Sequence, residues 1–401
     1  MVIDLDYLDA FHDNSLYIKL VSFGDPVMKK ESVDKKSIVY YIDIKKDSNK
    51  SLIERLAQMI DRSGLFKPIE SGDRVAVKMH FGERGGHGYI RTPFIGKIVQ
   101  KVKEYSGIPF LTDTNTLYVH KRHNAIDHLE TAAISGFTNE TVGAPIIIAD
   151  GLTGNDQETI KIKGNYFKEI FIGSAIYHSD FIIAATHLTG HPLAGFGGAI
   201  KNLAMGGASI KGKFLQHSEF LPRVDEDLCR LCGTCIESCG FNAIKKGKDS
   251  IYFIEENCTG CGECIGICKY GAIKPRFPGE SKKLQEKMVE YVMGIRNQKK
   301  KKIVYINFLI DITPGCDCYS LSNSPIVPDL GILLSGDPIA VDRASVDLVN
   351  SAPFNPLWSV KNKTDSKDKF KVIYKNIDWN CQLDYGQQMG IGNKEYKIIK
   401  I

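Results

Sequence analysis

Two runs of cysteines carry the strongest chemical signal in this sequence. Eight of the 11 cysteines lie within 40 residues, and each run has the spacing Cys-x2-Cys-x2-Cys-x3-Cys. The runs are Cys229, Cys232, Cys235 and Cys239, and then Cys258, Cys261, Cys264 and Cys268. This spacing is typical of bacterial ferredoxins with two [4Fe–4S] clusters, in which the fourth cysteine of each run ligates the other cluster. The sequence therefore predicts one-electron transfer at low potential.

The crossed pattern divides the eight thiolates between two clusters. Cluster 1 would be held by Cys229, Cys232, Cys235 and Cys268, and cluster 2 by Cys258, Cys261, Cys264 and Cys239. Zinc is the alternative, because CxxC pairs also form zinc sites, but a doubled four-cysteine run favours iron–sulfur clusters. Ferredoxin runs usually continue with proline, whereas Gly240 and Lys269 follow here. This departure affects the expected local turn and not the ligation.

A second candidate site precedes the cysteines. The segment 186–207, THLTGHPLAGFGGAIKNLAMGG, follows an apolar stretch and carries three glycines before an expected short helix, namely Gly195, Gly197 and Gly198. Backbone N–H groups at such a turn can bind a phosphate or a carboxylate, although glycines also serve close packing alone. His191, Lys201 and His217 accompany the turn. We expect these three residues to share a functional pocket and the glycines to bind its cofactor.

Other residues have a functional and a structural interpretation. His80 and the glycine-rich loop 82–87 are a second candidate pocket wall, or a surface loop. Polar groups for the same crevice could come from Arg91, Asp113 and Asn115, with helix capping as the alternative for Asp113. Cys316 and Cys318 form a CxC that could be a metal site, a redox pair or two small buried residues. We assign Asp337 and Asp342 to helix structure, and no role to Cys381.

The elements that must position these residues alternate between strands and helices. Apolar stretches predict strands at 38–44, 74–80, 108–111, 145–148, 181–186 and 303–310. Amphipathic stretches predict helices at 52–63, 93–105, 125–135, 282–295 and 337–350. Short apolar strands between helices indicate an α/β fold with a mostly parallel sheet and helices on both faces. An inserted ferredoxin-like domain would interrupt this body.

The expected organisation has four parts. Residues 1–36 form an N-terminal extension, 37–220 an α/β domain with the pocket, 221–280 the ferredoxin-like domain, and 281–401 the rest of the α/β body. With 43% hydrophobic and 25% charged residues, the composition is that of a globular protein. A net charge of +5 does not indicate a nucleic acid or membrane partner. The acidic start lacks signal-peptide features, and no cysteine precedes Cys229, so we expect a reducing cytoplasm.

Six segments together resemble the family called domain of unknown function 362. They are VAVKMHFGE, FLTDTNTLY, NAIDHLETA, HPLAGFGGAIKNLAMG, IDITPGCDCYS and PIVPDLGILLSGDPIAVDRAS. The resemblance covers roughly residues 37–350. Members of that family often carry a ferredoxin insert, so the resemblance implies an iron–sulfur centre protein, but it implies no particular reaction.

A more distant resemblance links HPLAGFGGAIK to the lactate racemase family. In that family a lysine anchors a nickel-pincer nucleotide, a histidine ten residues earlier serves in proton and hydride chemistry, and one sixteen residues later ligates nickel. These separations imply such roles for His191, Lys201 and His217, and a further catalytic histidine at His120 or His123. A serine and a proline of the family are replaced here by Gly197 and Met205, which puts the identity of the cofactor in doubt.

Three functions are consistent with the sequence. The first is a cytoplasmic oxidoreductase whose two clusters pass electrons from a donor protein to a small-molecule substrate or a further cofactor in the α/β pocket. The second is a non-enzymatic electron carrier or adaptor for partner oxidoreductases. The third is a racemase-like enzyme with nickel or another cofactor at His191, Lys201 and His217, and a structural ferredoxin part.

The crossed ligation can be tested with one substitution. Cys239→Ser should damage cluster 2, whose other three ligands come from the second run, and should leave cluster 1 intact. Separate quantification of the two clusters by EPR checks this. Loss of the signal from cluster 1 instead would refute the assignment.

Overall fold

The computed structural model describes most of the chain after residue 35. The described residues are 36–46, 48–117, 121–217, 221–258, 264, 268, 270, 272–275, 280–300, 302–320, 323–356 and 367–401. They belong to one compact unit, 36–401. The expected extension 1–36 lies outside them except for its last residue, and the boundaries at 220 and 280 stay predictions. None of the helices in this part of the chain is long and apolar enough to cross a membrane.

The central element is an eight-stranded, mostly parallel sheet with the order β16-β1-β15-β14-β7-β2-β3-β4. In that order the strands are Tyr396–Lys400, Ser37–Asp43, Gly331–Ser335, Ile303–Leu309, Phe181–His187, Arg74–Lys78, Ile108–Asp113 and Ile146–Ile148. Strand β15 runs antiparallel to both of its neighbours, and the five remaining pairings are parallel. The prediction of a mostly parallel α/β sheet is confirmed. Strands β15 and β16 were not predicted.

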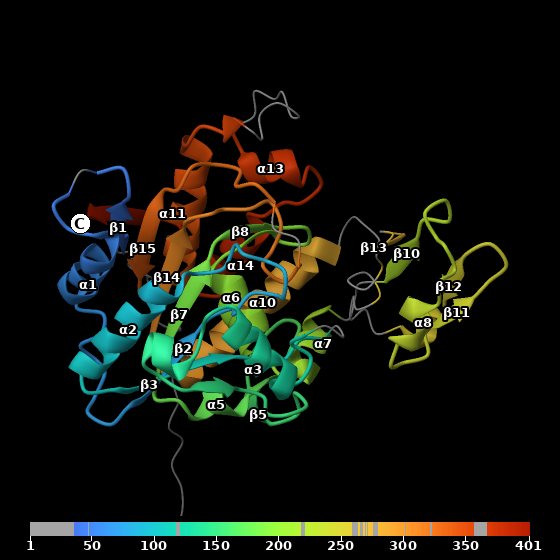
Figure 1. The fold of residues 1–401 in the computed structure, drawn as a ribbon, viewed down its shortest axis with the longest axis horizontal. Coiled ribbons are helices and arrows are strands. Elements are labelled where there is room, and N and C mark those ends of the chain that lie inside the picture. The colour runs from blue at the N-terminus through green and yellow to red at the C-terminus, as the bar shows by residue number, and fades with distance from the viewer. Residues whose placement is uncertain are drawn as a thin grey trace, which may run out of the picture. The chain divides into compact units, whose positions relative to one another are not determined.

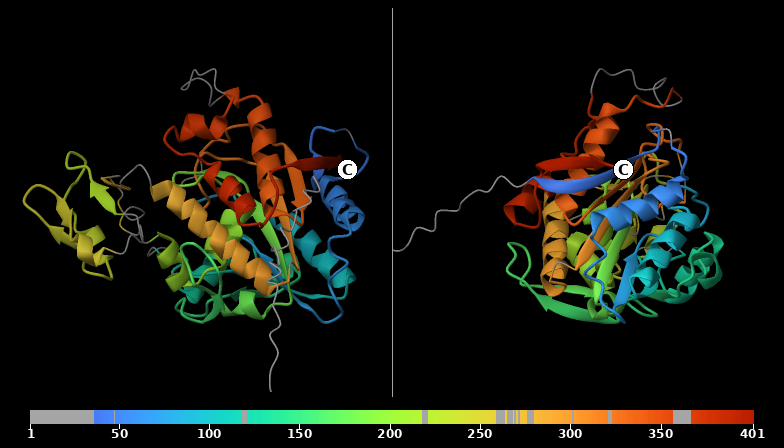
Figure 2. Two further views of the ribbon diagram at one scale, coloured as in Figure 1. Left: turned by 180° about the vertical axis from the view of Figure 1, so that it is seen from behind. Right: turned by 90° about the vertical axis from the view of Figure 1, so that its left-hand side faces the viewer.

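Helices pack against both faces of this sheet, as expected (Figures 1 and 2). One face is covered by α1 (Leu52–Ser63), α2 (Thr92–Glu104) and α3 (Ala125–Ile134). The other is covered by α5 (Ser174–His178), α6 (Ala199–Gly207), α10 (Glu280–Gln298) and α11 (Pro338–Ser351). Alternation along β7 explains the two layers, because Ile182 and Ala184 join one core and Ile183 and Ala185 the other.

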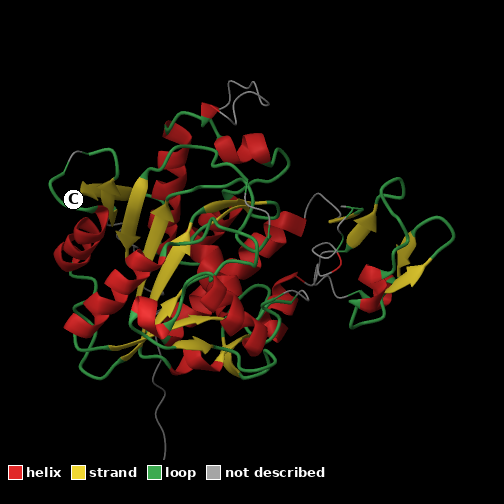
Figure 3. Cartoon of the chain, viewed as in Figure 1, coloured by secondary structure: helices red, strands yellow, loops and turns green. Residues whose placement is uncertain are grey.

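Smaller elements complete the body (Figure 3). The additional helices are α4 (Asn139–Val142), α7 (Ile210–His217), α13 (Lys369–Ile373) and α14 (Cys381–Gln388). Two hairpins are formed by β5 (Gln157–Lys161) with β6 (Glu169–Gly173), and by β8 (Thr189–His191) with β9 (Gly195–Gly197). The second hairpin lies directly between β7 and α6 in the chain, which is where the sequence placed its glycine-rich turn.

The cysteine-rich segment has short elements of its own. They are β10 (Pro222–Val224), α8 (Thr234–Glu237), β11 (Ile244–Lys246), β12 (Ile251–Phe253), the 3-10 turn Glu255–Asn257, and β13 (Ile273–Pro275). Strand β10 pairs with β13, and β11 pairs with β12. The buried residues of its small core are Cys235, Ile244, Ile251, Cys264 and Ile273. Two cysteines are thus part of the core itself.

The carboxylate of Asp342 joins two helices of the α/β body. Asp342 lies on α11 and is fully buried, and it accepts hydrogen bonds from the Ala199 and Ile200 N–H groups at 2.7 and 3.0 Å. The Asn307 amide donates a third bond at 2.8 Å. The Asp342 side chain therefore caps α6 as well as belonging to α11. Gly198 is needed here, because a Cβ at this position would lie 2.4 Å from the carboxylate.

Removal of this cap should destabilise the body. Asp342→Ala leaves three buried donors without their acceptor, and we expect it to lower the free energy of unfolding by about 2–4 kcal/mol. Asp342→Asn keeps one oxygen and should cost less than Asp342→Ala. Urea unfolding of the two variants measures the difference. Equal stability of wild type and Asp342→Ala would contradict the capping role.

Candidate functional site

The candidate pocket lies at the edge of the sheet where parallel strands end. Lys78, Asp113 and His187 are the last residues of β2, β3 and β7, which are neighbours in one parallel set. The carboxyl ends of parallel strands lie at the same edge, where open α/β sheets bind ligands. The loop after β14 reaches the same region, because His187 contacts Asp317 of that loop.

Lys201 projects from α6 toward the loop after β14. Its ammonium donates a hydrogen bond to the Cys316 sulfur at 3.4 Å. Burial is the main cause that lowers the pKa of Lys201 to about 8; Asp317 opposes this shift, and the Lys78 and Arg122 cations add to it. Lys201 therefore keeps most of its positive charge at neutral pH, although it is a weaker cation than an exposed lysine.

The structure brings the three sequence-predicted residues His191, Lys201 and His217 within electrostatic reach of one another. Burial, and then the charge of Lys201, hold the pKa of His191 well below its usual range. His217 is half-buried, and its pKa is lowered to about 4 by burial, with Lys201 again contributing. Both rings are thus neutral at pH 7 and could ligate a metal or exchange a proton. Their catalytic role stays a prediction.

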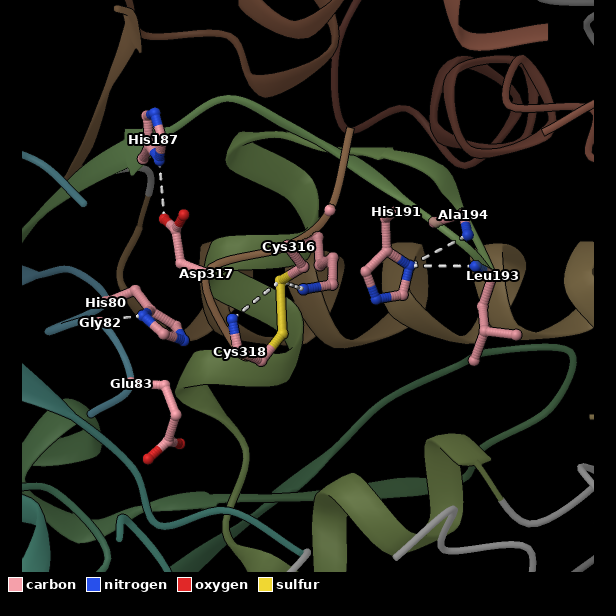
Figure 4. Close-up of a disulfide and its surroundings, with 12 residues drawn as sticks. His80, Gly82, Glu83, His187, His191, Leu193, Ala194, Cys316, Asp317 and Cys318 are labelled. Atoms are coloured by element: carbon pink, nitrogen blue, oxygen red, sulfur yellow. Dashed lines mark hydrogen bonds and ion pairs between the residues drawn. A yellow bond between two sulfur atoms is a disulfide. The ribbon is translucent and has the colours of Figure 1, made fainter. Parts of the chain in front are cut away.

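The hydrogen bonds of His191 fix its tautomer. Its Nδ1 accepts the backbone N–H groups of Leu193 and Ala194 at 3.2 and 3.1 Å, so the ring proton is on Nε2. His80 has the same arrangement, because its Nδ1 accepts the Gly82 N–H at 2.9 Å. In the view of Figure 4 the two rings lie on either side of the loop after β14. Burial, and then the charges of Arg122 and Lys201, hold the pKa of the His80 ring well below its usual range, so His80 lies near Lys201, and its role as a pocket wall stays a prediction.

His187 has the opposite character from these rings. Its Nδ1 lies 2.7 Å from an Asp317 oxygen (Figure 4). Its Nε2 lies 2.7 Å from the Ile310 carbonyl oxygen. Both ring nitrogens face acceptors, so both must donate. Burial alone would lower the pKa of His187, but Asp317 and the carbonyl outweigh it and raise the pKa. His187 is therefore an imidazolium that holds the loop after β14.

A buried ionic network lies beneath the pocket, and the sequence interpretation missed most of it. Lys78 is 1% exposed, and its ammonium lies 3.2 Å from Asp113 and 2.6 Å from the Asn202 amide oxygen. Arg122 lies 3.1 Å from Glu83 and 3.8 Å from Asp113. A lysine at the end of the apolar strand RVAVK was the available signal, because such a buried lysine needs a nearby carboxylate.

The structure resolves the alternatives for Asp113, one of the other polar residues. Asp113 is an orienting carboxylate and not the cap of α3, which is Asn124. Asn115 is fully buried and its amide donates to Asp150 at 3.0 Å, and its contribution to the crevice stays a prediction. Arg91 is exposed and pairs with Asp311 of the loop after β14 at 2.7 Å, and its contribution to the crevice stays a prediction.

The racemase resemblance left open which of two histidines is the further catalytic histidine. His123 is half-buried, and its Nδ1 bonds to the Thr116 carbonyl oxygen at 2.9 Å. His120 lies outside the described residues. The structure therefore gives no reason to prefer His120, and the choice stays open.

The three glycines of the predicted cofactor turn pack closely. Gly195, the first residue of β9, has a φ of +76°, and a Cβ there would lie 2.5 Å from Trp379. A Cβ at Gly197 would lie 3.3 Å from the Lys201 side chain, and Gly198 borders the Asp342 carboxylate. The anion received by this helix N-terminus is the Asp342 carboxylate. Cofactor binding by the glycines stays a prediction, and it would need donors other than the Ala199 and Ile200 N–H groups.

The CxC motif forms a disulfide between Cys316 and Cys318. Cys316 is 7% exposed and Cys318 is half-buried, so the interpretation as two small buried residues is incomplete. Next to them a small cavity of about 10 Å³, roughly the space of one water molecule, borders Gly82, Glu83 and Asp317. Cys381, to which no role was assigned, begins α14.

Described cysteines from both runs gather in the core of the cysteine-rich segment. Cys235 and Cys264 are buried there, and partly buried cysteines from both runs pack against them, namely Cys229, Cys239 and Cys268. Burial raises the pKa of the Cys235 thiol to about 11, with Cys232, Cys268 and Cys229 adding to the effect. In the described residues, which do not include Cys261, no group of three or more His, Cys, Asp or Glu is arranged to hold a single metal ion.

The charge state of His187 gives a test of the ion pair. Its pKa is raised in the folded protein, so its stabilising contribution is complete below the ordinary value of 6.5 and is lost as pH rises through the folded pKa. Asp317→Asn removes the counter-charge, and burial should then bring the pKa of His187 below 6.5. NMR titration of the His187 ring measures both values. An unchanged pKa in Asp317→Asn would contradict the charged pair.

Several solved structures match this chain, and the two described next are distant from it. The lactate racemase apoprotein from Thermoanaerobacterium thermosaccharolyticum matches with 10% identity and a TM-score of 0.33, over 69% of this chain and 51% of that one. A Thermotoga maritima protein of known crystal structure matches with 9% identity and a TM-score of 0.36, over 67% and 52%. The chain thus spans about half the length of these two proteins. Similarity this low supports no inference about cofactor or activity.

Sequence comparison gives a clearer result. None of the curated proteins matches this sequence. The family model described as "Domain of unknown function (DUF362)" matches residues 75–347, which is more than half of the chain. The resemblance noted in six sequence segments is confirmed, and the chain belongs to the DUF362 family.

Proposed function

We propose that this protein is an iron–sulfur oxidoreductase with a substrate pocket in its α/β body. The observation that carries the proposal is the doubled four-cysteine run. Two [4Fe–4S] clusters held by these thiolates would supply single electrons at low potential. An electron carrier alone does not require an α/β body with a buried ionic network at its ligand-binding edge.

The placement of the described cysteines supports the crossed ligand sets. Cys268 of the second run lies close enough to Cys235 of the first to affect the pKa of its thiol, as do Cys229 and Cys232. These four are the ligands expected for cluster 1. Packing of Cys239 and Cys264 into the same small core agrees with the set for cluster 2. The donor set therefore fits iron–sulfur clusters.

The pocket residues support a substrate with a negative charge. Lys201 is a cation near neutral pH, and the Lys78 and Arg122 cations are close enough to lower its pKa. The nearby His191 and His217 rings are neutral, because their pKa values are lowered. A carboxylate or phosphate group would pair with Lys201, and the neutral rings could then move a proton on the substrate.

Metal analysis tests the proposal and separates its alternatives. Protein purified without oxygen should contain about eight irons per chain, as two [4Fe–4S] clusters require, and no nickel. Cys381→Ser is a matched control, since Cys381 lies on α14 outside both runs and its loss should leave the iron content unchanged.

Other results would contradict the proposal. Zinc in place of iron would overturn the iron–sulfur part. Nickel bound in the wild type and lost in His217→Ala would favour the racemase-like alternative. The non-enzymatic carrier would be favoured if the protein had its full iron content and both Lys201→Ala and His191→Ala left electron transfer to partner proteins unchanged.

A further inference from the structure

The Cys316–Cys318 disulfide lies outside the proposed cluster ligands and calls for an explanation of its own. Its two cysteines are separated by one residue, with their Cα atoms 5.2 Å apart. They lie in the loop that follows β14, at the same edge of the sheet as Lys201 and His187. The proposed function uses neither sulfur.

The two sulfurs have different surroundings. Cys316 is 7% exposed, and its sulfur receives hydrogen bonds from the Lys201 ammonium at 3.4 Å and from the Cys318 N–H at 3.5 Å. Cys318 is half-buried and thus more accessible than Cys316. Both donors to Cys316 would stabilise a negative charge on its sulfur. Such a charge arises only when the disulfide is opened.

The loop is held before the disulfide and between its two cysteines. Asp317, between the cysteines, pairs with the His187 imidazolium at 2.7 Å. The Tyr374 hydroxyl donates to the Pro314 carbonyl oxygen at 2.6 Å, and the Gly190 N–H donates to the Thr313 carbonyl oxygen at 2.8 Å. The two sulfurs would therefore stay close after reduction, which allows the disulfide to form again.

We propose that Cys316 and Cys318 form a two-electron thiol–disulfide centre that exchanges with dithiol and disulfide compounds. Cys318 is the sulfur that an incoming thiolate attacks. Cys316 is the thiolate that leaves, and Lys201 is the cation that stabilises it. The proposal does not depend on iron–sulfur clusters.

The reaction balances with a dithiol as the reductant. One thiolate of the dithiol attacks the Cys318 sulfur, so that a mixed disulfide forms and the Cys316–Cys318 bond breaks to give the Cys316 thiolate. The second thiol of the reductant loses its proton and attacks the mixed disulfide, which releases Cys318 as a thiolate that takes up that proton. The dithiol is oxidised by two electrons, and the protein disulfide is reduced by two.

A positive charge beside Cys316 should speed this exchange. Disulfides open faster when the leaving thiol has a low pKa, and a nearby lysine lowers the pKa of a thiol. Burial lowers the pKa of Lys201 itself to about 8. The ammonium therefore persists near neutral pH, and the rate advantage should fall as pH rises above about 8.

The full-length protein allows a direct experiment. Trypsin cleavage after Lys302 and Arg343 gives a peptide 303–343 that contains Cys316 and Cys318 and no other cysteine. The native protein is treated with dithiothreitol redox buffers, quenched with acid, alkylated and analysed by mass spectrometry. We expect a reversible change between the disulfide and two alkylated thiols. With glutathione as a monothiol, the mixed disulfide should form on Cys318.

Variants of two lysines test the assigned roles. Lys201→Met should slow reduction of the disulfide by roughly tenfold, and Lys201→Arg should restore most of the rate because it keeps the charge. Lys211→Met is the matched control; this exposed lysine stacks on Phe171 and should have no effect.

Four results would overturn the proposal. The disulfide could react only after denaturation, or glutathione could attach to Cys316. Reduction could be equally fast in wild type and Lys201→Met. The native protein could also contain two thiols that mild oxidation does not convert to a disulfide. The glutathione measurement needs no variant, so misfolding of Lys201→Met would not affect it. Protein that lacks iron but has a reactive disulfide would contradict only the iron–sulfur proposal. Protein that contains its iron but has an unreactive disulfide would contradict only the proposal of a thiol–disulfide centre.

Discussion

The buried carboxylate of Asp113 is the charge on which the arrangement of the pocket depends. It is 3% exposed and lies 3.2 Å from the Lys78 ammonium and 3.8 Å from Arg122. Burial alone would raise the pKa of Asp113, but the surrounding cations lower it and keep the group ionised. Without this charge, the buried Lys78 would lose its carboxylate partner and Arg122 would keep only Glu83, which is costly in an interior of low dielectric constant. Lys78 then links the network to α6 through Asn202.

Much of the fold could be predicted from local sequence patterns. Strands such as β7 (FIIAATH) are short apolar stretches between helices, and this pattern is enough to indicate a parallel sheet. Strand β15 was missed because it is only five residues long, begins with Gly331, and lies close to the Asp337–Pro338 helix start that dominated the interpretation. Strand β16 (YKIIK) lies at the sheet edge and has no fully buried residue and no regular alternation, so its pattern is weak.

The site was less accessible to sequence reasoning, because its contacts join distant residues. Spacing within one segment was enough to group His191, Lys201 and His217. No local pattern shows that Asp342 fills the helix N-terminus 142 residues away, or that Lys201 meets Cys316. Both contacts are ordinary polar interactions. The packing of α11 and of the loop after β14 against α6 determines which groups meet.

The position of β1 in the sheet has a consequence for the order of assembly during translation. Strand β1 is synthesised before every other described strand, yet its two neighbours are β15 and β16, which are synthesised last. The Arg55 guanidinium of α1 likewise donates to the carbonyl oxygen of Ile401. Strands β2, β3 and β7 can pair as they emerge from the ribosome, whereas β1 has to wait with its edges uncovered. The half of the sheet that holds the pocket can thus form first, and β1 is incorporated at the end.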